Sequence, residues 1–192
     1  MKEIEFWFSI GSTYTYLSVT RLKELEKKYK VKFSWKPFSV RKIMKEMNNI
    51  PFPSSKKVKL DYMWRDIKRR AEMYGFEANV PAPYPLQEFD LANQIAIVGM
   101  EENWCAEYTE ATYRHWFISG HEAGLEPNIS KSLKGIDQKI NRVLKLANSV
   151  KIKNIYSEQT YIAKNKGIFG SPSFLVDEEL FWGDDRLEQA IN

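Results

Sequence analysis

Strand-like alternation of apolar and polar residues occurs only at the two ends of this 192-residue chain. Residues 4–10 alternate with the period of a strand buried mainly on one face, and 31–35 repeat the pattern after an amphipathic helix over 14–30. This β-α-β order predicts two parallel strands with a right-handed crossover. The pattern returns as a hairpin over 173–176 and 180–182, before a short last helix. Neither end can bury a sheet alone, so we expect one four-stranded sheet flanked by helices.

Between these ends, residues 39–166 have only helical periodicity, interrupted by the segments NNIPFPSS and VPAPYPL. We therefore expect an α/β fold in which residues 1–38 and 167–192 form one discontinuous domain, while 39–166 form a large all-helical insertion. The helices predicted within this insertion are 39–48, 56–75, 88–102, 104–121, 130–147 and 154–166.

Composition excludes several classes of protein. The single cysteine, Cys105, excludes an internal disulfide and a Cys-x-x-Cys redox or zinc site, and no metal site is predicted. No apolar run approaches the ~20 residues of a membrane span, and the start MKEIEF is acidic where a signal peptide is apolar. We therefore expect a soluble, cytoplasmic protein. The net charge is only +4, and acidic residues interrupt the basic cluster within 56–70, so no nucleic-acid partner is expected.

Ser12 stands where the first strand gives way to the helix at 14–30. The free N–H groups and the dipole of a helix N-terminus favour an anion at this place. The alternative is that Ser12 or Thr13 simply caps the helix, a common role for these residue types. A serine hydrolase is disfavoured, because both histidines lie far away in the helical region and no Gly-x-Ser-x-Gly motif exists.

A second set of polar residues lies in GIFGSPSFLVDEELFWGDDRLEQ, residues 167–189. Pro172 directly precedes a predicted strand, and a cis Ser171–Pro172 bond would leave neighbouring backbone groups free to bind an extended peptide. The alternative is an ordinary trans turn, because only ~5–6% of such bonds are cis. Asp184 and Asp185 stand where a helix cap and its neighbour are expected.

With these motifs, the chain resembles the 2-hydroxychromene-2-carboxylate isomerases and the related kappa-class glutathione transferases. The resemblance is carried by FWFSIGSTYTYLS near the start, by KVKLDYMWRDIKRRAEMYGF and VPAPYP in the middle, and most specifically by the C-terminal segment 167–189. It extends over nearly the whole chain. It implies a thioredoxin fold split by a helical insertion, as in DsbA-like proteins, with 1–38 and 167–192 as the thioredoxin-like domain.

The resemblance implies a glutathione site. In it, Ser12 would meet the glutathione sulfur, the backbone of Ser171 would pair with the cysteinyl part beside the cis-proline, and an acidic pair would take the γ-glutamyl ammonium. The residues implied in the site are Ser12, Asn49, Ser171, Pro172, Asp184 and Asp185.

The resemblance further implies a glutathione-dependent cis–trans isomerase, expected as a homodimer, that converts a small aromatic carboxylate of the 2-hydroxychromene-2-carboxylate type. Lys36 and Lys59 are candidates for holding the substrate carboxylate, and Tyr14, Tyr84 and Trp182 for flanking its ring. A kappa-like glutathione transferase or peroxidase, with the same cofactor, is the first alternative. A DsbA-like peptide-binding module without redox activity is the second, because Ser12 stands where DsbA proteins have their first active cysteine.

Overall fold

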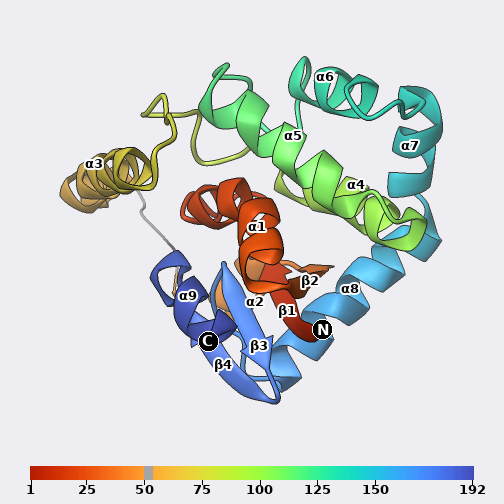
Figure 1. Cartoon of the computed structure of the whole chain (residues 1–192). Coiled ribbons are helices and arrows are strands. Elements are labelled where there is room, and N and C mark those ends of the chain that lie inside the picture. The colour runs from red at the N-terminus through yellow and green to blue at the C-terminus, as the bar shows by residue number, and fades with distance from the viewer. Residues whose placement is uncertain (50–53) are drawn as a thin grey trace.

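The computed structural model describes residues 1–49 and 54–192. Its sheet has the strand order β2-β1-β3-β4, with β1 and β2 parallel and β3 antiparallel to both β1 and β4. The strands are β1 (Lys2–Phe8), β2 (Val31–Pro37), β3 (Ser173–Val176) and β4 (Glu179–Trp182). Both ends of the chain therefore join in one four-stranded sheet, as the sequence predicts (Figure 1).

Helices account for most of the remaining chain. Helix α1 (Thr15–Tyr29) connects β1 to β2, and η2 (Asp184–Arg186) and α9 (Leu187–Ile191) follow β4. The helices between β2 and β3 are α2 (Val40–Glu46), η1 (Ser54–Lys56), α3 (Lys57–Tyr74), α4 (Phe89–Glu102), α5 (Cys105–Phe117), α6 (Asn128–Lys134), α7 (Ile140–Ala147) and α8 (Val150–Asn165). None of the helices in the described ranges has the length and apolar character that a membrane span requires.

Three predicted helix boundaries are wrong. The predicted helix 130–147 is two helices, because Asp137 takes a left-handed conformation at φ 57° and the Gln138 N–H turns back to the Leu133 carbonyl. Helix α8 begins at Val150, where the Ser149 side chain caps it, and not at 154. Helix α5 ends at Phe117, before Gly120 with its positive φ, and does not continue to 121.

The first strand is buried on both faces, contrary to the prediction of one buried face. Phe6 and Phe8 point to one face, where Phe6 stacks on Phe174 of β3 at 5.4 Å between ring centroids. Trp7 points to the other face and is equally buried, beside Phe38. Central strands covered by helices on both faces lose the simple alternation that identifies a half-exposed strand.

The helical insertion packs against α1 through aromatic side chains. The ring of Tyr16 in α1 stacks on Phe117 of α5 with 4.2 Å between centroids, and α5 lies next to α1 in Figure 1. One hydrophobic core continues from the sheet through α1 into the insertion. The division of the chain into two domains stays a prediction.

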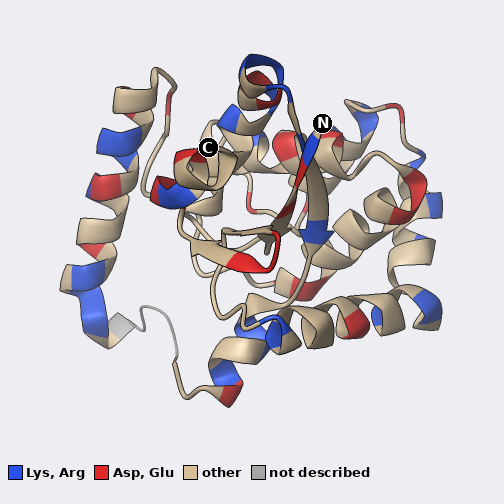
Figure 2. Ribbon diagram, turned by 60° about the horizontal axis from the view of Figure 1, so that its bottom comes forward, with Lys and Arg blue, Asp and Glu red and all other residues tan. Residues whose placement is uncertain are grey.

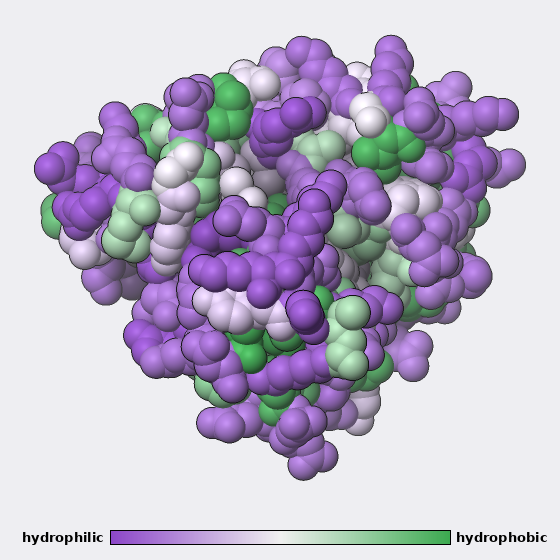
Figure 3. All heavy atoms as spheres, in the orientation of Figure 1, coloured by the Kyte–Doolittle hydropathy of each residue, from purple (hydrophilic) through white to green (hydrophobic). Residues whose placement is uncertain are grey.

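The described surface is mostly polar and mixed in charge. Hydrophilic residues cover most of the face shown in Figure 3, where hydrophobic residues form small separate patches. Basic and acidic residues alternate along α3, as Figure 2 shows. This mixture fits a solvated helix face.

Candidate functional site at the start of the first helix

Ser12 lies in the turn between β1 and α1, where its N–H donates to the Ser9 carbonyl at 3.0 Å. Helix α1 begins at Thr15, and the residue at its N-cap, Tyr14, makes no side-chain capping bond. The Ser12 hydroxyl donates instead to the carbonyl of Ser171, with 2.6 Å between the oxygens. The capping alternative for Ser12 is therefore wrong, because its hydroxyl donates to a distant carbonyl and does not accept from an N–H of the helix.

Ser171 joins the C-terminal segment to this turn from 159 residues away in the sequence. The Ser171–Pro172 bond is cis, so the alternative of a trans turn is also wrong. The Ser171 hydroxyl accepts from the Ser9 N–H at 2.9 Å. It also forms a hydrogen bond of 2.8 Å with Thr15 Oγ1, in which either hydroxyl can donate. Within the described residues, the Ser171 N–H donates to no acceptor. This N–H therefore remains available to a ligand.

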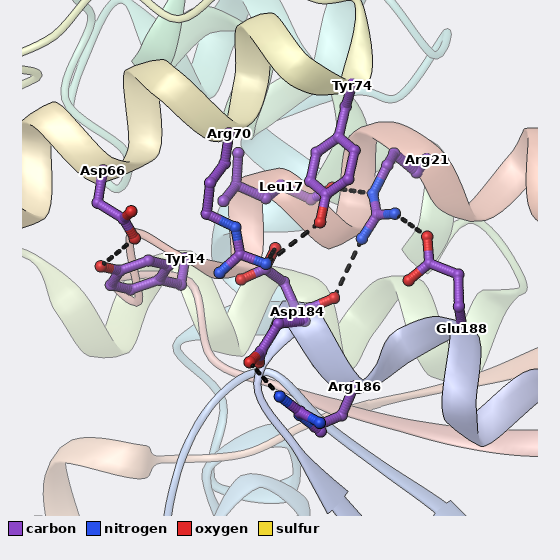
Figure 4. Close-up of polar contacts among 10 residues, drawn as sticks. Tyr14, Leu17, Arg21, Asp66, Arg70, Tyr74, Asp184, Arg186 and Glu188 are labelled. Atoms are coloured by element: carbon purple, nitrogen blue, oxygen red, sulfur yellow. Dashed lines mark hydrogen bonds and ion pairs between the residues drawn. The ribbon is translucent and has the colours of Figure 1, made fainter.

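Asp184 is buried, with 1% of its surface exposed, and is held by two arginines. Arg70 Nη2 of α3 lies 2.7 Å from Asp184 Oδ2, close enough for an ion pair but not aligned as a hydrogen bond. Arg21 of α1 donates to the Asp184 carbonyl at 3.1 Å (Figure 4). Burial raises the pKa of Asp184 to about 7, although Arg70 and Arg21 act to lower it.

Asp185 has a different environment. Its side chain is half exposed and forms an ion pair with Arg186 at 2.9 Å. No side-chain bond caps η2, so the expectation that Asp184 caps the last helix is wrong. The two neighbouring acids therefore differ, since one is tied inside the fold and the other is accessible to a ligand.

A polar cluster that the sequence did not predict links α1, α3 and η2 (Figure 4). The Tyr14 hydroxyl donates to Asp66 at 2.9 Å, and burial together with this bond raises the pKa of Tyr14 above its ordinary range. Arg21 lies over the Tyr74 ring, 3.8 Å from its centroid, and Arg70 donates to the Tyr74 hydroxyl at 3.2 Å. Asp66 and Arg70 lie four residues apart and therefore on one face of the helix, and this spacing was the sequence signal for a polar cluster here.

Trp182 lies against Gly170, the residue before Ser171. It is 55% exposed and packs against Phe169, which is 38% exposed, with 4.8 Å between ring centroids. Its indole lies so close to Gly170 that a Cβ on that residue would overlap it. The exposed aromatic pair therefore adjoins the segment that carries Ser171, and the sequence did not point to Phe169.

The other predicted residues lie elsewhere or have other contacts. Lys36 is half-buried in β2, opposite Trp7 in register, and Lys59 is exposed in the first turn of α3. The Tyr84 ring packs edge to face against Trp64, with 5.9 Å between ring centroids. Asn49 is exposed, with its N–H bound to the Met44 carbonyl, and adjoins the residues outside the described ranges. Among the described residues, no hydrogen bond or ion pair connects these four side chains to Ser12.

Two surface cavities of about 460 and 390 Å³ lie between α2 and α8, away from Ser12. The residues lining both are Lys42, Glu46, Ser157 and Thr160. In the part of the chain that the structure describes, no group of three or more His, Cys, Asp or Glu side chains could hold a metal ion.

Comparison with known proteins supports the fold described above. A family described as a DSBA-like thioredoxin domain matches residues 3–191. The chain is 27% identical over 187 residues to a 2-hydroxychromene-2-carboxylate isomerase of Pseudomonas putida, covering 96% of this chain and 90% of that protein. It is 22% identical over 204 residues to a glutathione S-transferase kappa 2 of Caenorhabditis elegans, covering 100% and 91%.

Solved structures share the fold. A 2-hydroxychromene-2-carboxylate isomerase superposes with a TM-score of 0.86 at 24% identity, covering 97% of this chain and 91% of that chain. The cytosolic disulfide reductase DsbM of Pseudomonas aeruginosa superposes with a TM-score of 0.66 at 10% identity, covering 98% and 92%. The thioredoxin-like α/β fold and the resemblance found in the sequence are both confirmed.

Proposed function

We propose that this chain, which belongs to the family of DSBA-like thioredoxin domains, is a glutathione-dependent cis–trans isomerase of a small aromatic carboxylate. The observation that carries the proposal is the Ser12 hydroxyl, which donates at 2.6 Å to Ser171 beside the N-terminus of α1. A hydroxyl donor held at a helix N-terminus suits a thiolate. The names of the relatives support an isomerase or a glutathione transferase as the class of enzyme.

Two groups at this site would stabilise a thiolate. A thiol pKa near 8.5 falls by about two units if the site prefers the thiolate by roughly 2.7 kcal/mol. A hydroxyl hydrogen bond to a charged acceptor contributes ~1.5–3 kcal/mol. The N-terminus of α1, which has no acidic residue in its first turn, adds ~0.3–1 kcal/mol. In this role the Ser12 hydroxyl would donate to the sulfur in place of the Ser171 carbonyl. Ser12 would need no general base, because it donates a hydrogen bond and does not attack.

Two of the described groups would bind the tripeptide. The free N–H of Ser171 would pair with its cysteinyl part, and the accessible carboxylate of Asp185 would take the γ-glutamyl ammonium. Asp184, whose carboxylate is paired with Arg70, would act by holding the segment that carries Asp185. Pro172 and Asn49 stay predictions for the same site. Bound glutathione would supply a thiolate that adds reversibly to the conjugated substrate, allows rotation about the former double bond, and leaves unconsumed.

The second substrate would lie against the exposed aromatic pair. Trp182 and Phe169 present ring surface next to Ser171, where a planar aromatic compound could stack. Lys36 and Lys59 stay candidates for the substrate carboxylate, and Tyr84 for the ring. Tyr14 stays a candidate at the rim, with its hydroxyl already bound to Asp66.

Two alternatives remain. A kappa-like transferase or peroxidase would use the same glutathione site, and the nematode relative favours it. A peptide-binding module without redox activity would use the Ser171 backbone alone. A homodimer and a cytoplasmic location stay predictions.

The decisive experiment follows the ultraviolet spectrum of 2-hydroxychromene-2-carboxylate with and without glutathione. Turnover should require glutathione and fall about 10- to 10²-fold in Ser12→Ala, because the lost bond to a charged acceptor stabilises the thiolate by ~1.5–3 kcal/mol. The control is Ser119→Ala, which removes an exposed hydroxyl in the loop after α5. Turnover without glutathione, or full activity of Ser12→Ala, contradicts the proposal. Glutathione conjugation or peroxide reduction without isomerisation indicates the first alternative, and no glutathione binding indicates the second.

A further inference from the structure

The turn that carries Ser12 is held by side chains of the helical insertion. After β1 ends at Phe8, the backbone from Ser9 to Ser12 leaves the sheet and loses its strand partners. Buried N–H and C=O groups need other partners in such a segment. Two buried polar residues of the insertion, Asn93 and Tyr113, supply partners for both backbone groups of Ile10 and for the carbonyls of Ser9 and Ser12.

Asn93 of α4 replaces a neighbouring strand for Ile10. Its Oδ1 accepts from the Ile10 N–H at 2.8 Å, and its Nδ2 donates to the Ile10 carbonyl at 2.8 Å. The second Nδ2 hydrogen goes to the Phe89 carbonyl at 2.9 Å. The side chain is 0% exposed, so these bonds have no competition from solvent. Only an amide side chain offers this acceptor and two donors together.

Tyr113 of α5 holds the other end of the turn. Its hydroxyl lies 2.9 Å from the Ser12 carbonyl and 3.2 Å from the Ser9 carbonyl, and it can donate to either. The residue is 1% exposed, and burial raises its pKa above the ordinary tyrosine range. The hydroxyl therefore stays protonated and acts as a donor throughout the working pH range.

Close packing fixes the same turn against α4. Gly11 has a φ of +127°, and a Cβ at this residue would overlap the Phe89 ring. The turn thus touches the insertion through Ile10 and Gly11, which precede Ser12, and through the Ser12 carbonyl.

We propose that Asn93 and Tyr113 are positioning residues, which set the Ser12 hydroxyl for the sulfur of bound glutathione. The inference rests on the proposed function. It gives the helical insertion a role in the reaction, because the insertion controls how well Ser12 stabilises the thiolate. A displacement on the order of 1 Å at a reacting group can cost about 10²-fold in rate.

The test measures the pKa of the bound glutathione thiol from the ultraviolet absorbance of the thiolate, together with kcat and KM for glutathione. Tyr113→Phe removes one oxygen and should raise the bound thiol pKa and lower kcat by about 10-fold. The KM for glutathione should change by less than about 3-fold, because Ser171 and Asp185 are untouched. Asn93→Asp, which cannot donate to the Ile10 carbonyl, should act in the same direction. Tyr108→Phe is the matched control, since this buried hydroxyl in α5 donates to the Ala92 carbonyl and not to the turn.

A double-mutant cycle separates positioning from general stability. In a Ser12→Ala background, Tyr113→Phe should have no further effect on the thiol pKa, because the hydroxyl that it positions is gone. An equal effect in both backgrounds, or an unchanged thiol pKa in a folded Tyr113→Phe variant, overturns the positioning role alone. A wild-type protein that shows no bound thiolate overturns the proposed function itself, and the positioning role with it.

Discussion

The guanidinium of Arg70 in α3 lies 2.7 Å from the carboxylate of Asp184 in η2, and this buried ion pair fastens α3 to the C-terminal segment. Asp184 is almost fully buried. Its desolvation outweighs the attraction of Arg70 and Arg21, which raises the pKa of Asp184 to about 7. The pair is therefore fully ionised only at a pH above about 7.

This pKa predicts a pH-dependent stability that Asp184→Asn removes. The ordinary pKa is 3.8 and the folded value about 7, so between them the folded state holds a proton that the unfolded state has lost. The free energy of unfolding of the wild type should fall as pH rises from about 4 to 7, by at most about 4 kcal/mol from this residue. Urea unfolding at several pH values measures this slope. Asp137→Asn is the control and should keep the wild-type slope, because Asp137 is exposed and its charge is not among those that act on Asp184. Equal slopes for the wild type and Asp184→Asn would rule out the raised pKa.

Gly11→Ala should destabilise the protein more than the same change at another glycine with positive φ. Both Gly11 and Gly75 have a φ that disfavours alanine, at +127° and +83°. A Cβ at Gly75 would meet nothing within 4 Å, whereas at Gly11 it would overlap Phe89. The strained backbone alone costs roughly 1–2 kcal/mol, and overpacking adds about 1–3 kcal/mol at Gly11. Thermal and urea unfolding should give Gly11→Ala a lower free energy of unfolding than Gly75→Ala. The reverse order would show that the Phe89 ring moves aside freely.

Much of the fold was predictable because it depends on local patterns. The alternation in residues 4–10 and 173–182 identified the strands, and their positions at the two ends required one shared sheet. The break between α6 and α7 was missed because the apolar pattern continues through Gly135 and Asp137. Their turn-forming chemistry was the local signal for that break.

The site was only partly predictable, because its key contacts join distant segments. Residue propensity favoured a capping role for Ser12, but its hydroxyl donates instead to the Ser171 carbonyl, 159 residues away in the sequence. Asn93 stands out in the sequence as a polar residue within an apolar helix, yet its bonds to Ile10 depend on how α4 packs. No spacing rule relates residues that tertiary packing alone brings together.

The only cysteine should be inert in the folded protein. Cys105 is buried at the start of α5, and burial raises the pKa of its thiol from 9.0 to about 12, although a hydrogen bond with Thr109 acts to lower it. Near pH 8 the thiolate fraction should therefore be about 10³-fold below that of an unburied thiol, so a disulfide reagent should label the native protein slowly and the urea-unfolded protein at once. Ser12→Cys provides the matched comparison, since it puts a second thiol at the N-terminus of α1, where the helix dipole favours the thiolate. One fast equivalent in Ser12→Cys and none in the wild type is expected. Fast labelling of the wild type would contradict the burial of Cys105 and the raised pKa of its thiol.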